Sequence, residues 1–296
     1  MVPELQNALG AWGRVQLLRD VPQEPTGGLD PADGDLVVRN LTFHYGEGRP
    51  PALRDISLSF TRGRSYALVG RTGSGKSTLA KVLTRAVDVP AGTVFLGGTD
   101  VTRLDVEALR RWTAIVPQRT EILAGTLAEN IALFDPELLP RAGDALAELG
   151  LTAWVESLPD GVGTRLGEGG YVLSAGQEQL VAFARILVRD PKVVILDEAT
   201  ARMDPVTEAW VQRATDRLLA GRIGVIVAHR LSSVQRCDEV VVLADGAVLE
   251  AGPMAESRRF AELLASSHAV APARAAGGVA VLDREPDEPA RTELIN

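Results

Sequence analysis

One nine-residue stretch constrains the fold of this chain more than any other feature, because it requires a strand before it and a helix after it. The apolar run at 66–69 predicts the short buried strand, and residues 79–86 predict the helix. A strand, a glycine-rich loop and a helix in this order are typical of a phosphate-binding loop in an α/β protein. The nine residues are Gly70, Arg71, Thr72, Gly73, Ser74, Gly75, Lys76, Ser77 and Thr78.

The residue types of this loop suit a nucleoside triphosphate. Glycines let backbone N–H groups turn towards phosphate oxygens, and the start of the following helix adds partial positive charge. The Lys76 ammonium would reach the β- and γ-phosphates, and the Ser77 hydroxyl would be a ligand of Mg²⁺. A glycine-rich turn that merely precedes lysine and serine is the alternative, and motifs farther along the chain argue against it.

The bulk composition excludes several classes of protein. A chain of 296 residues with 46% hydrophobic content can bury one large core or two modest ones. No run of about 18 apolar residues and no secretory signal pattern is present, so we expect that the chain itself neither crosses a membrane nor is secreted. The net charge of −8 argues against nucleic-acid binding. The single cysteine, Cys237, excludes an internal disulfide and is expected to be a small buried side chain.

The first half of the chain predicts three structural regions. The apolar spacing at 5–18 and the Pro- and Gly-rich residues after it predict an amphipathic helix and a linker over 1–34. Strands at 36–43 and 56–60 predict an antiparallel β lobe near the start, with Tyr45 placed either to stack on a base or to lie at a sheet edge. A further short strand is predicted at 93–96. After a helix at 105–111 and a strand at 113–116, the pattern over about 119–178 predicts an inserted helical lobe.

The second half predicts alternating parallel strands and helices. The apolar run at 192–196 reads as a strand covered on both faces, and it ends in Asp197 and Glu198. A helix at 206–219 and a strand at 223–228 lead to His229, followed by a hairpin at 238–250 and a last helix at 256–265. Because ligands bind at the carboxyl ends of such strands, the two acids and the phosphate loop are expected to converge. The composition from 268 to 296 predicts a disordered tail.

A short motif lies at the start of the helix predicted after the glycine-rich segment. It consists of Leu173, Ser174, Ala175, Gly176 and Gln177, and Ser174 is placed to cap the helix.

The order of these motifs resembles the nucleotide-binding domain of ATP-binding cassette (ABC) transporters over about residues 36–260. The stretch at 116–131 resembles the exporter subgroup, and the opening helix and linker resemble the exit from the last transmembrane helix of an exporter. The resemblance implies a P-loop NTPase fold with a three-layer core, an antiparallel β subdomain and an inserted helical subdomain. It places the nucleotide-binding domain at 35–267.

The resemblance also implies roles for single residues. Glu198 would polarise the water that attacks the γ-phosphate, and His229 would orient that water. Asp197 would hold the shell of Mg²⁺, and Gln118 would bind Mg²⁺ or the water and report to a membrane domain. Tyr45 matches the aromatic residue that stacks on adenine.

A dimer follows from the same resemblance. The motif Ser174, Ala175, Gly176 and Gln177 would contact ATP held by a second nucleotide-binding domain, with Asp204 in the loop that crosses between the two. Two domains would therefore close head to tail over two ATP molecules. We expect them to drive a transmembrane domain from the cytoplasmic face of the membrane.

This chain departs from the family pattern at several positions. Ala175 replaces a glycine, Glu178 stands where a basic residue is frequent, the acidic-Arg-Gly stretch is Glu168, Gly169 and Gly170, and Ala201 replaces a serine. If residue 175 needed a positive φ, its methyl group would weaken the site offered to the partner. A homodimer and a heterodimer with unequal sites both stay open, and the sequence does not identify the transported substrate.

Two other classes compete with the exporter motor. A soluble ABC protein of DNA repair or translation would need a coiled-coil or zinc insertion, or a second cassette, and neither feature is present. A small-molecule kinase would have no use for the motif at 173–177. Three tryptophans, at 112, 154 and 210, are expected to be packing residues, and His44 to face solvent. The three histidines lack the spacing of a zinc site.

Overall fold

A six-stranded sheet organises the part of the chain that the computed structural model describes, namely residues 12, 13, 15, 16, 24, 27–117, 120–197, 203–228 and 231–269. Five of its strands are parallel. They are β6 (Thr113–Val116), β9 (Val193–Asp197), β10 (Ile223–Val227), β3 (Ser65–Val69) and β11 (Glu239–Ala244), and the antiparallel β12 (Ala247–Pro253) completes the sheet. All five residues of β10 are buried, as a strand covered on both faces requires.

An antiparallel sheet forms the β lobe. Its strands lie in the order β2 (Leu53–Phe60), β1 (Leu36–Phe43), β4 (Val94–Leu96) and β5 (Thr99–Asp100). With helices α2 (Lys76–Leu83) and α3 (Val106–Trp112), this lobe encloses one hydrophobic cluster against one face of the six-stranded sheet. Phe60, Leu79 and Ile195 belong to that cluster.

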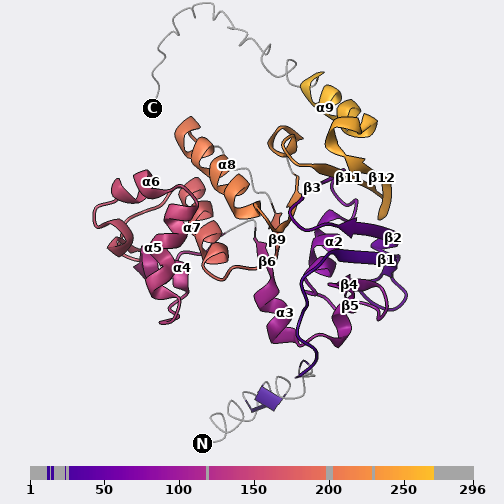
Figure 1. Ribbon diagram of the computed structural model, residues 1–296, viewed down its shortest axis with the longest axis horizontal. Coiled ribbons are helices and arrows are strands. Elements are labelled where there is room, and N and C mark those ends of the chain that lie inside the picture. Colours follow the sequence, from indigo (N-terminus) through magenta and orange to yellow (C-terminus); the bar gives the residue numbers. More distant parts are fainter. Residues whose placement is uncertain are drawn as a thin grey trace, which may run out of the picture.

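Helices α7 (Ala175–Leu187) and α8 (Pro205–Leu219) cover the other face of the sheet. Helices α4 (Leu127–Ala132), α5 (Ala142–Glu148) and α6 (Thr152–Glu156) pack against α7 and one another, and the paired short strands β7 (Gly125–Thr126) and β8 (Arg165–Leu166) belong to the same lobe. In Figure 1, α4 to α7 gather on one side of the molecule and the β lobe on the other. Leu180 and Val194 lie in this second cluster, while Ile195 lies in the first, so neighbouring residues of β9 face opposite layers.

Helix α9 (Arg258–Ala269) is the last described element. It follows the hairpin of β11 and β12 and lies beside it in Figure 1. Short 3-10 turns at Leu231–Val234 and Met254–Glu256 complete this region. Asp245 and Gly246 form the turn with left-handed φ values of 48° and 80°, as the Asp-Gly pair predicts. Phe260 of α9 is buried in the cluster on the helical face.

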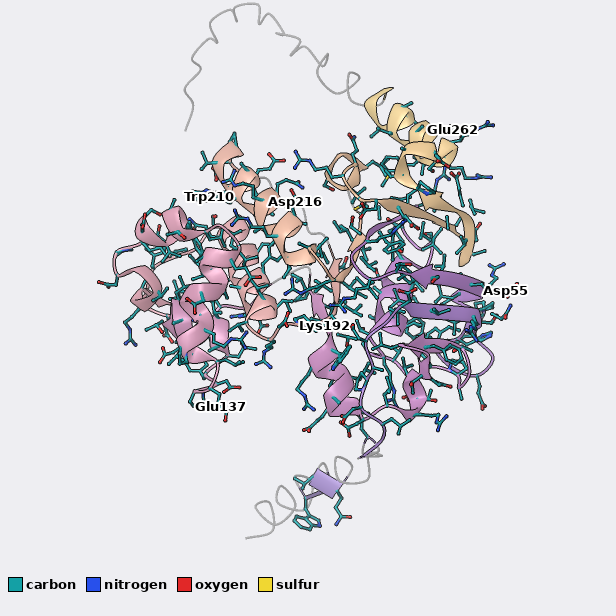
Figure 2. All side chains as sticks on the ribbon, viewed as in Figure 1. Asp55, Glu137, Lys192, Trp210, Asp216 and Glu262 are labelled. Carbon is teal, nitrogen blue, oxygen red and sulfur yellow. The ribbon has the colours of Figure 1, made fainter. Side chains whose placement is uncertain are left out.

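The predicted α/β class is confirmed: a mostly parallel sheet has helices on both faces, and an antiparallel β lobe and a helical lobe adjoin it. The three tryptophans pack against the two clusters, and Figure 2 shows Trp210 on α8. Cys237 is buried and His44 is exposed, as expected. Among the described residues, no helix has the length and apolar character needed to cross a bilayer.

Other predictions concern residues outside the described part of the chain. The helix predicted at 5–18 lies mostly outside the described residues, although Trp12, Gly13, Val15 and Gln16 are helical. The tail after residue 269 also lies outside them. The limits set at 34/35 and 267/268, and those of the helical lobe at 119–178, therefore stay predictions.

Candidate nucleotide site

The predicted phosphate loop joins the end of β3 to the start of α2. Gly75 caps α2 in a left-handed conformation with φ 102°, and no side chain among the described residues caps this helix. The first turn of α2 contains no acidic residue. Unsatisfied N–H groups and the partial positive charge of the helix therefore meet at the loop, which is the arrangement that binds a phosphate.

Lys76 is held inside the loop. Its Nζ donates hydrogen bonds to the carbonyl oxygens of Gly70, at 2.8 Å, and Arg71, at 3.1 Å, and the residue is only 9% exposed. Burial lowers the pKa of the Lys76 ammonium, and the Asp197 carboxylate partly offsets this effect. The structure thus brings Lys76 and Asp197 within electrostatic reach of each other, as the convergence of strand ends predicts.

The loop depends on a distant hairpin, which the sequence analysis missed. A Cβ atom at Gly70, where φ is 151°, would lie 2.2 Å from the carbonyl oxygen of Leu243. The N–H of Gly246 donates to the carbonyl oxygen of Ser74 at 3.1 Å. Asp-Gly predicts a turn, but no local signal says that this turn supports the phosphate loop.

Tyr45 lies beside the loop. Its hydroxyl donates to Oγ1 of Thr78 at 3.2 Å, and its ring packs edge-on against Phe43 with centroids 5.1 Å apart. The side chain is still 48% exposed, so it keeps a surface that a base could cover. Stacking on adenine stays a prediction.

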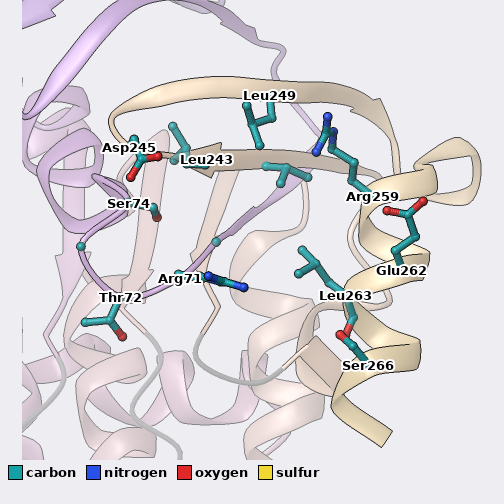
Figure 3. Close-up of a pocket in the computed structure, with 14 residues that line it drawn as sticks. Arg71, Thr72, Ser74, Leu243, Asp245, Leu249, Arg259, Glu262, Leu263 and Ser266 are labelled. Atoms are coloured by element: carbon teal, nitrogen blue, oxygen red, sulfur yellow. The ribbon is translucent and has the colours of Figure 1, made fainter. Parts of the chain in front are cut away.

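A cavity of about 630 Å³ opens on another side of the loop. It is lined by residues 70–74, the β11 and β12 hairpin and helix α9, and Figure 3 shows the Arg71 side chain directed towards α9. Tyr45 and Lys76 do not line it. The cavity therefore adjoins only the first five residues of the phosphate loop.

The motif at 173–177 begins helix α7 as predicted. Ser174 caps the helix: its Oγ accepts a hydrogen bond from the Gln177 N–H at 3.3 Å, and Gln177 Oε1 accepts one from the Ser174 N–H at 3.0 Å. Ala175 is the first helical residue, is exposed and does not have a positive φ. The methyl group at this position therefore causes no backbone strain.

The same motif packs against the start of α8. Gly176 is buried, and a Cβ there would lie 2.3 Å from Thr207 Cγ2 and 3.1 Å from Met203 Sδ. Asp204 caps α8, with Oδ1 accepting from the N–H groups of Val206 and Thr207 at 3.1 and 3.0 Å. The hydrogen bonds with Thr207 lower the pKa of the Asp204 carboxyl.

The structure therefore forms two separate groups of predicted residues. Tyr45, the loop at 70–78 and Asp197 form one, and the motif at 174–177 with Asp204 forms the other. Their helices α2 and α7 pack on opposite faces of the six-stranded sheet. Gln118, Glu198 and His229 lie outside the described residues. Among the described residues, no cluster of three or more His, Cys, Asp or Glu suits a metal ion.

Comparisons with known proteins agree with this geometry. The sequence model of the ABC transporter family matches residues 53–201. The ATP-dependent lipid A-core flippase of Salmonella typhimurium (strain LT2) is 38% identical over 260 residues, which cover 86% of this chain and 44% of the flippase. The flippase of the same description from Photorhabdus laumondii is 39% identical over 254 residues, covering 84% and 44%.

A solved structure is also similar. It is described as a bacterial Atm1-family ABC exporter with ATP bound, has 28% sequence identity and a TM-score of 0.75, and matches 89% of this chain and 48% of that chain. The chain thus spans less than half the length of the relatives it matches. It belongs to the ABC transporter family, as an ATP-binding ATPase domain of the exporter type.

Proposed function

We propose that two nucleotide-binding domains close head to tail over two molecules of Mg-ATP and that hydrolysis drives export by a transmembrane domain. The separation of the two residue groups carries this proposal. The phosphate loop leads into α2 on one face of the sheet, and the motif at 174–177 begins α7 on the other face. One chain alone would therefore not surround a triphosphate with both groups.

The residues present fit Mg²⁺. Ser77 is exposed on the first turn of α2, and Asp197 lies at the end of β9, within electrostatic reach of Lys76. Hydroxyl and carboxylate oxygens are the ligands that Mg²⁺ prefers, and the ion usually keeps several waters. Gln118 would add an amide oxygen. When bound, the ion would neutralise charge on the β- and γ-phosphates.

Each step of hydrolysis has a candidate residue. Lys76 would exchange its two carbonyl partners for phosphate oxygens, and Tyr45 would hold the base. Glu198 would accept a hydrogen bond from the attacking water, with His229 completing the orientation of that water against the γ-phosphorus. The helix start at Ser174 of the second domain would bind the remaining phosphate oxygens.

The similar proteins support the proposal that this ATPase works at a membrane. They are described as ATP-dependent flippases and as an ABC exporter. We therefore assign this chain to the cytoplasmic face of a membrane, where a transmembrane domain would hold it. Ala175 adopts ordinary helical geometry, which removes one reason to expect unequal sites, and both a homodimer and a heterodimer fit.

Sedimentation of the Glu198→Gln variant tests the proposal. Without hydrolysis, Mg-ATP should convert the monomer into a dimer, while Glu198→Gln with Lys76→Ala should stay monomeric because it no longer holds the triphosphate. Steady-state hydrolysis by Glu198→Gln should fall by about two orders of magnitude or more. Unchanged hydrolysis would exclude Glu198 as the base, and a monomer that binds ATP without associating would contradict the homodimer.

A further inference from the structure

Asn130 lies at the centre of a buried hydrogen-bond network in the helical lobe. The residue is 0% exposed. Its Oδ1 accepts from the Leu123 N–H at 2.9 Å and from Arg185 Nη2 at 3.1 Å. Its Nδ2 donates to the carbonyl oxygens of Leu123, at 2.9 Å, and Thr126, at 3.1 Å. One side chain therefore binds both backbone groups of Leu123 and reaches helix α7.

Arg185 forms the other half of the network. It lies on α7, and its Nε donates to the carbonyl oxygen of Asn130 at 2.7 Å. Burial lowers the pKa of Arg185, and no acidic side chain pairs with it among the described residues. Arg185 is partly buried, so holding its charge among neutral groups carries a desolvation cost.

The network connects two segments that matter for the proposed function. Leu123 lies five positions after Gln118, the predicted ligand of Mg²⁺ or the attacking water. Helix α7 begins at the motif that would contact the partner's ATP. The strand pairing of Gly125 with Leu166, and the hydrogen bond from the Tyr171 N–H to the Arg165 carbonyl oxygen at 2.7 Å, connect the first segment to the residues just before the motif.

We propose that Asn130 and Arg185 are positioning residues that make residues 120–125 and helix α7 move as one unit. Nucleotide bound at the chain's own phosphate loop would then change how the motif at 174–177 is presented to the second domain. The proposal rests on the ATP-driven dimer proposed above, and it adds the residues that connect the two halves of the site.

Replacing Asn130 by Asp separates this role from simple folding. The carboxylate keeps the acceptor for Leu123 N–H and gives Arg185 a counter-ion, so the packing and the charge are compensated. It loses the two donors, which frees the carbonyl oxygens of Leu123 and Thr126. The variant should therefore fold, while the segment at 120–125 keeps only one of its two hydrogen bonds to residue 130 and is held less firmly against α7.

A matched control is available on the neighbouring helix. Arg217 of α8 donates to the carbonyl oxygen of Glu148 at 3.1 Å, so it also joins a long helix to the backbone of the helical lobe. It touches neither Leu123 nor α7 through a hydrogen bond among the described residues. Arg217→Gln removes an exposed hydrogen bond between a long helix and the helical lobe without disturbing the proposed connection.

The experiment measures three quantities on the full chain in the Glu198→Gln background: melting temperature, ATP affinity of the monomer and the dissociation constant of the ATP-bound dimer. We expect Asn130→Asp to change monomer affinity less than about twofold and to weaken the dimer about tenfold, the effect of losing one or two buried hydrogen bonds. Arg185→Gln should act in the same direction, and Arg185→Lys should restore part of the loss. Arg217→Gln should leave the dimer unchanged.

Hydrogen exchange distinguishes failure of this proposal from failure of the dimer. The parent protein here is the Glu198→Gln variant. In its dilute monomer, ATP should change the hydrogen-exchange rates of the amides at 174–177, whereas adding Asn130→Asp should abolish this change. If the parent fails to dimerise but shows this response, the dimer is wrong and the connection stands. The connection is overturned if Asn130→Asp responds like the parent, if the parent shows no response, or if affinity and dimerisation fall together with melting temperature.

Discussion

The neighbouring positions 175 and 176 differ in the space they leave for a side chain. A Cβ at residue 176 would meet Thr207 and Met203, whereas the Ala175 methyl group is exposed. We predict that Gly176→Ala forces α7 away from α8, lowers the free energy of unfolding by about 1–3 kcal/mol and weakens the dimer. Urea unfolding and sedimentation with Mg-ATP measure both effects.

Ala175→Gly is the control for this prediction. It restores the residue common in the family, but the helical conformation does not need glycine. We expect unchanged ATPase activity and a free energy of unfolding that is lower by at most about 1 kcal/mol. A marked rise in activity would show that the methyl group does impede the partner.

Lys76 is predicted to oppose folding when no nucleotide is bound. Burial lowers the pKa of its ammonium in the folded chain from an ordinary value of 10.5, so charging Lys76 disfavours the native state. The unfolded chain keeps this proton to higher pH. The free energy of unfolding of the wild type, relative to Lys76→Met, should therefore rise as pH increases from 7 towards 10.5. An unchanged difference across this range would contradict the burial effect.

Single residues also show how far sequence reasoning reaches. The loop at 70–78, Ser174 as a helix cap and Asp197 at a strand end all follow from local patterns, and the structure places them as expected. The requirement for glycine at residue 70 does not, because it comes from Leu243, which is distant in sequence. Asn130 and Arg185 were missed for the same reason: each looks ordinary until the fold brings α4 and α7 together.

At the scale of elements, the start of α8 depends on a single titratable cap. The Asp204 carboxylate accepts hydrogen bonds from two backbone N–H groups. Its pKa is lowered in the folded chain, so ionisation of Asp204 stabilises the folded state. This contribution is fully present above the ordinary value of 3.8 and is lost as pH falls through the lower folded value. Asparagine caps helices without titrating.

We therefore predict that Asp204→Asn unfolds with less dependence on pH than the wild type below about pH 5. Urea midpoints at pH 7 and pH 3 provide the measurement. Asp204→Ala should lose the cap at both values, which separates capping from charge. Equal pH dependence in wild type and Asp204→Asn would show that the carboxylate does not contribute.

Element boundaries were predicted less well than element types. Helix α2 begins at Lys76, not at residue 79, because the left-handed Gly75 starts it before its apolar pattern appears. Strand β2 begins at Leu53, not at 56, because pairing of Leu53 with Phe43 extends the ladder past a register shift at Asp55, where φ is 46°. These starts depend on backbone geometry and pairing, which periodicity does not reveal.

At the scale of the whole molecule, the two layers should respond to ATP separately. The phosphate loop and Tyr45 belong to the β-lobe side, and the motif at 174–177 belongs to the helical side. In the dimer of the Glu198→Gln variant, Mg-ATP should protect amides of both groups from hydrogen exchange. In dilute monomer it should protect the amides at 72–78 strongly and only alter those at 174–177. Equal strong protection in the monomer would contradict a site shared between two chains.

The position of β3 in the sheet has a consequence during synthesis. This strand lies between β10 and β11, and Ser65 at its start is hydrogen-bonded to Asp238, which is 173 positions later. At typical translation rates, roughly 10 to 35 s separate the synthesis of these two residues. The strand before the phosphate loop has two unpaired edges until β10 is made and one until β11 is made, and such edges are sites for wrong pairing. The loop is complete as a sequence by residue 78, but the nascent chain acquires its nucleotide site only once the ribosome has passed the β11 and β12 hairpin.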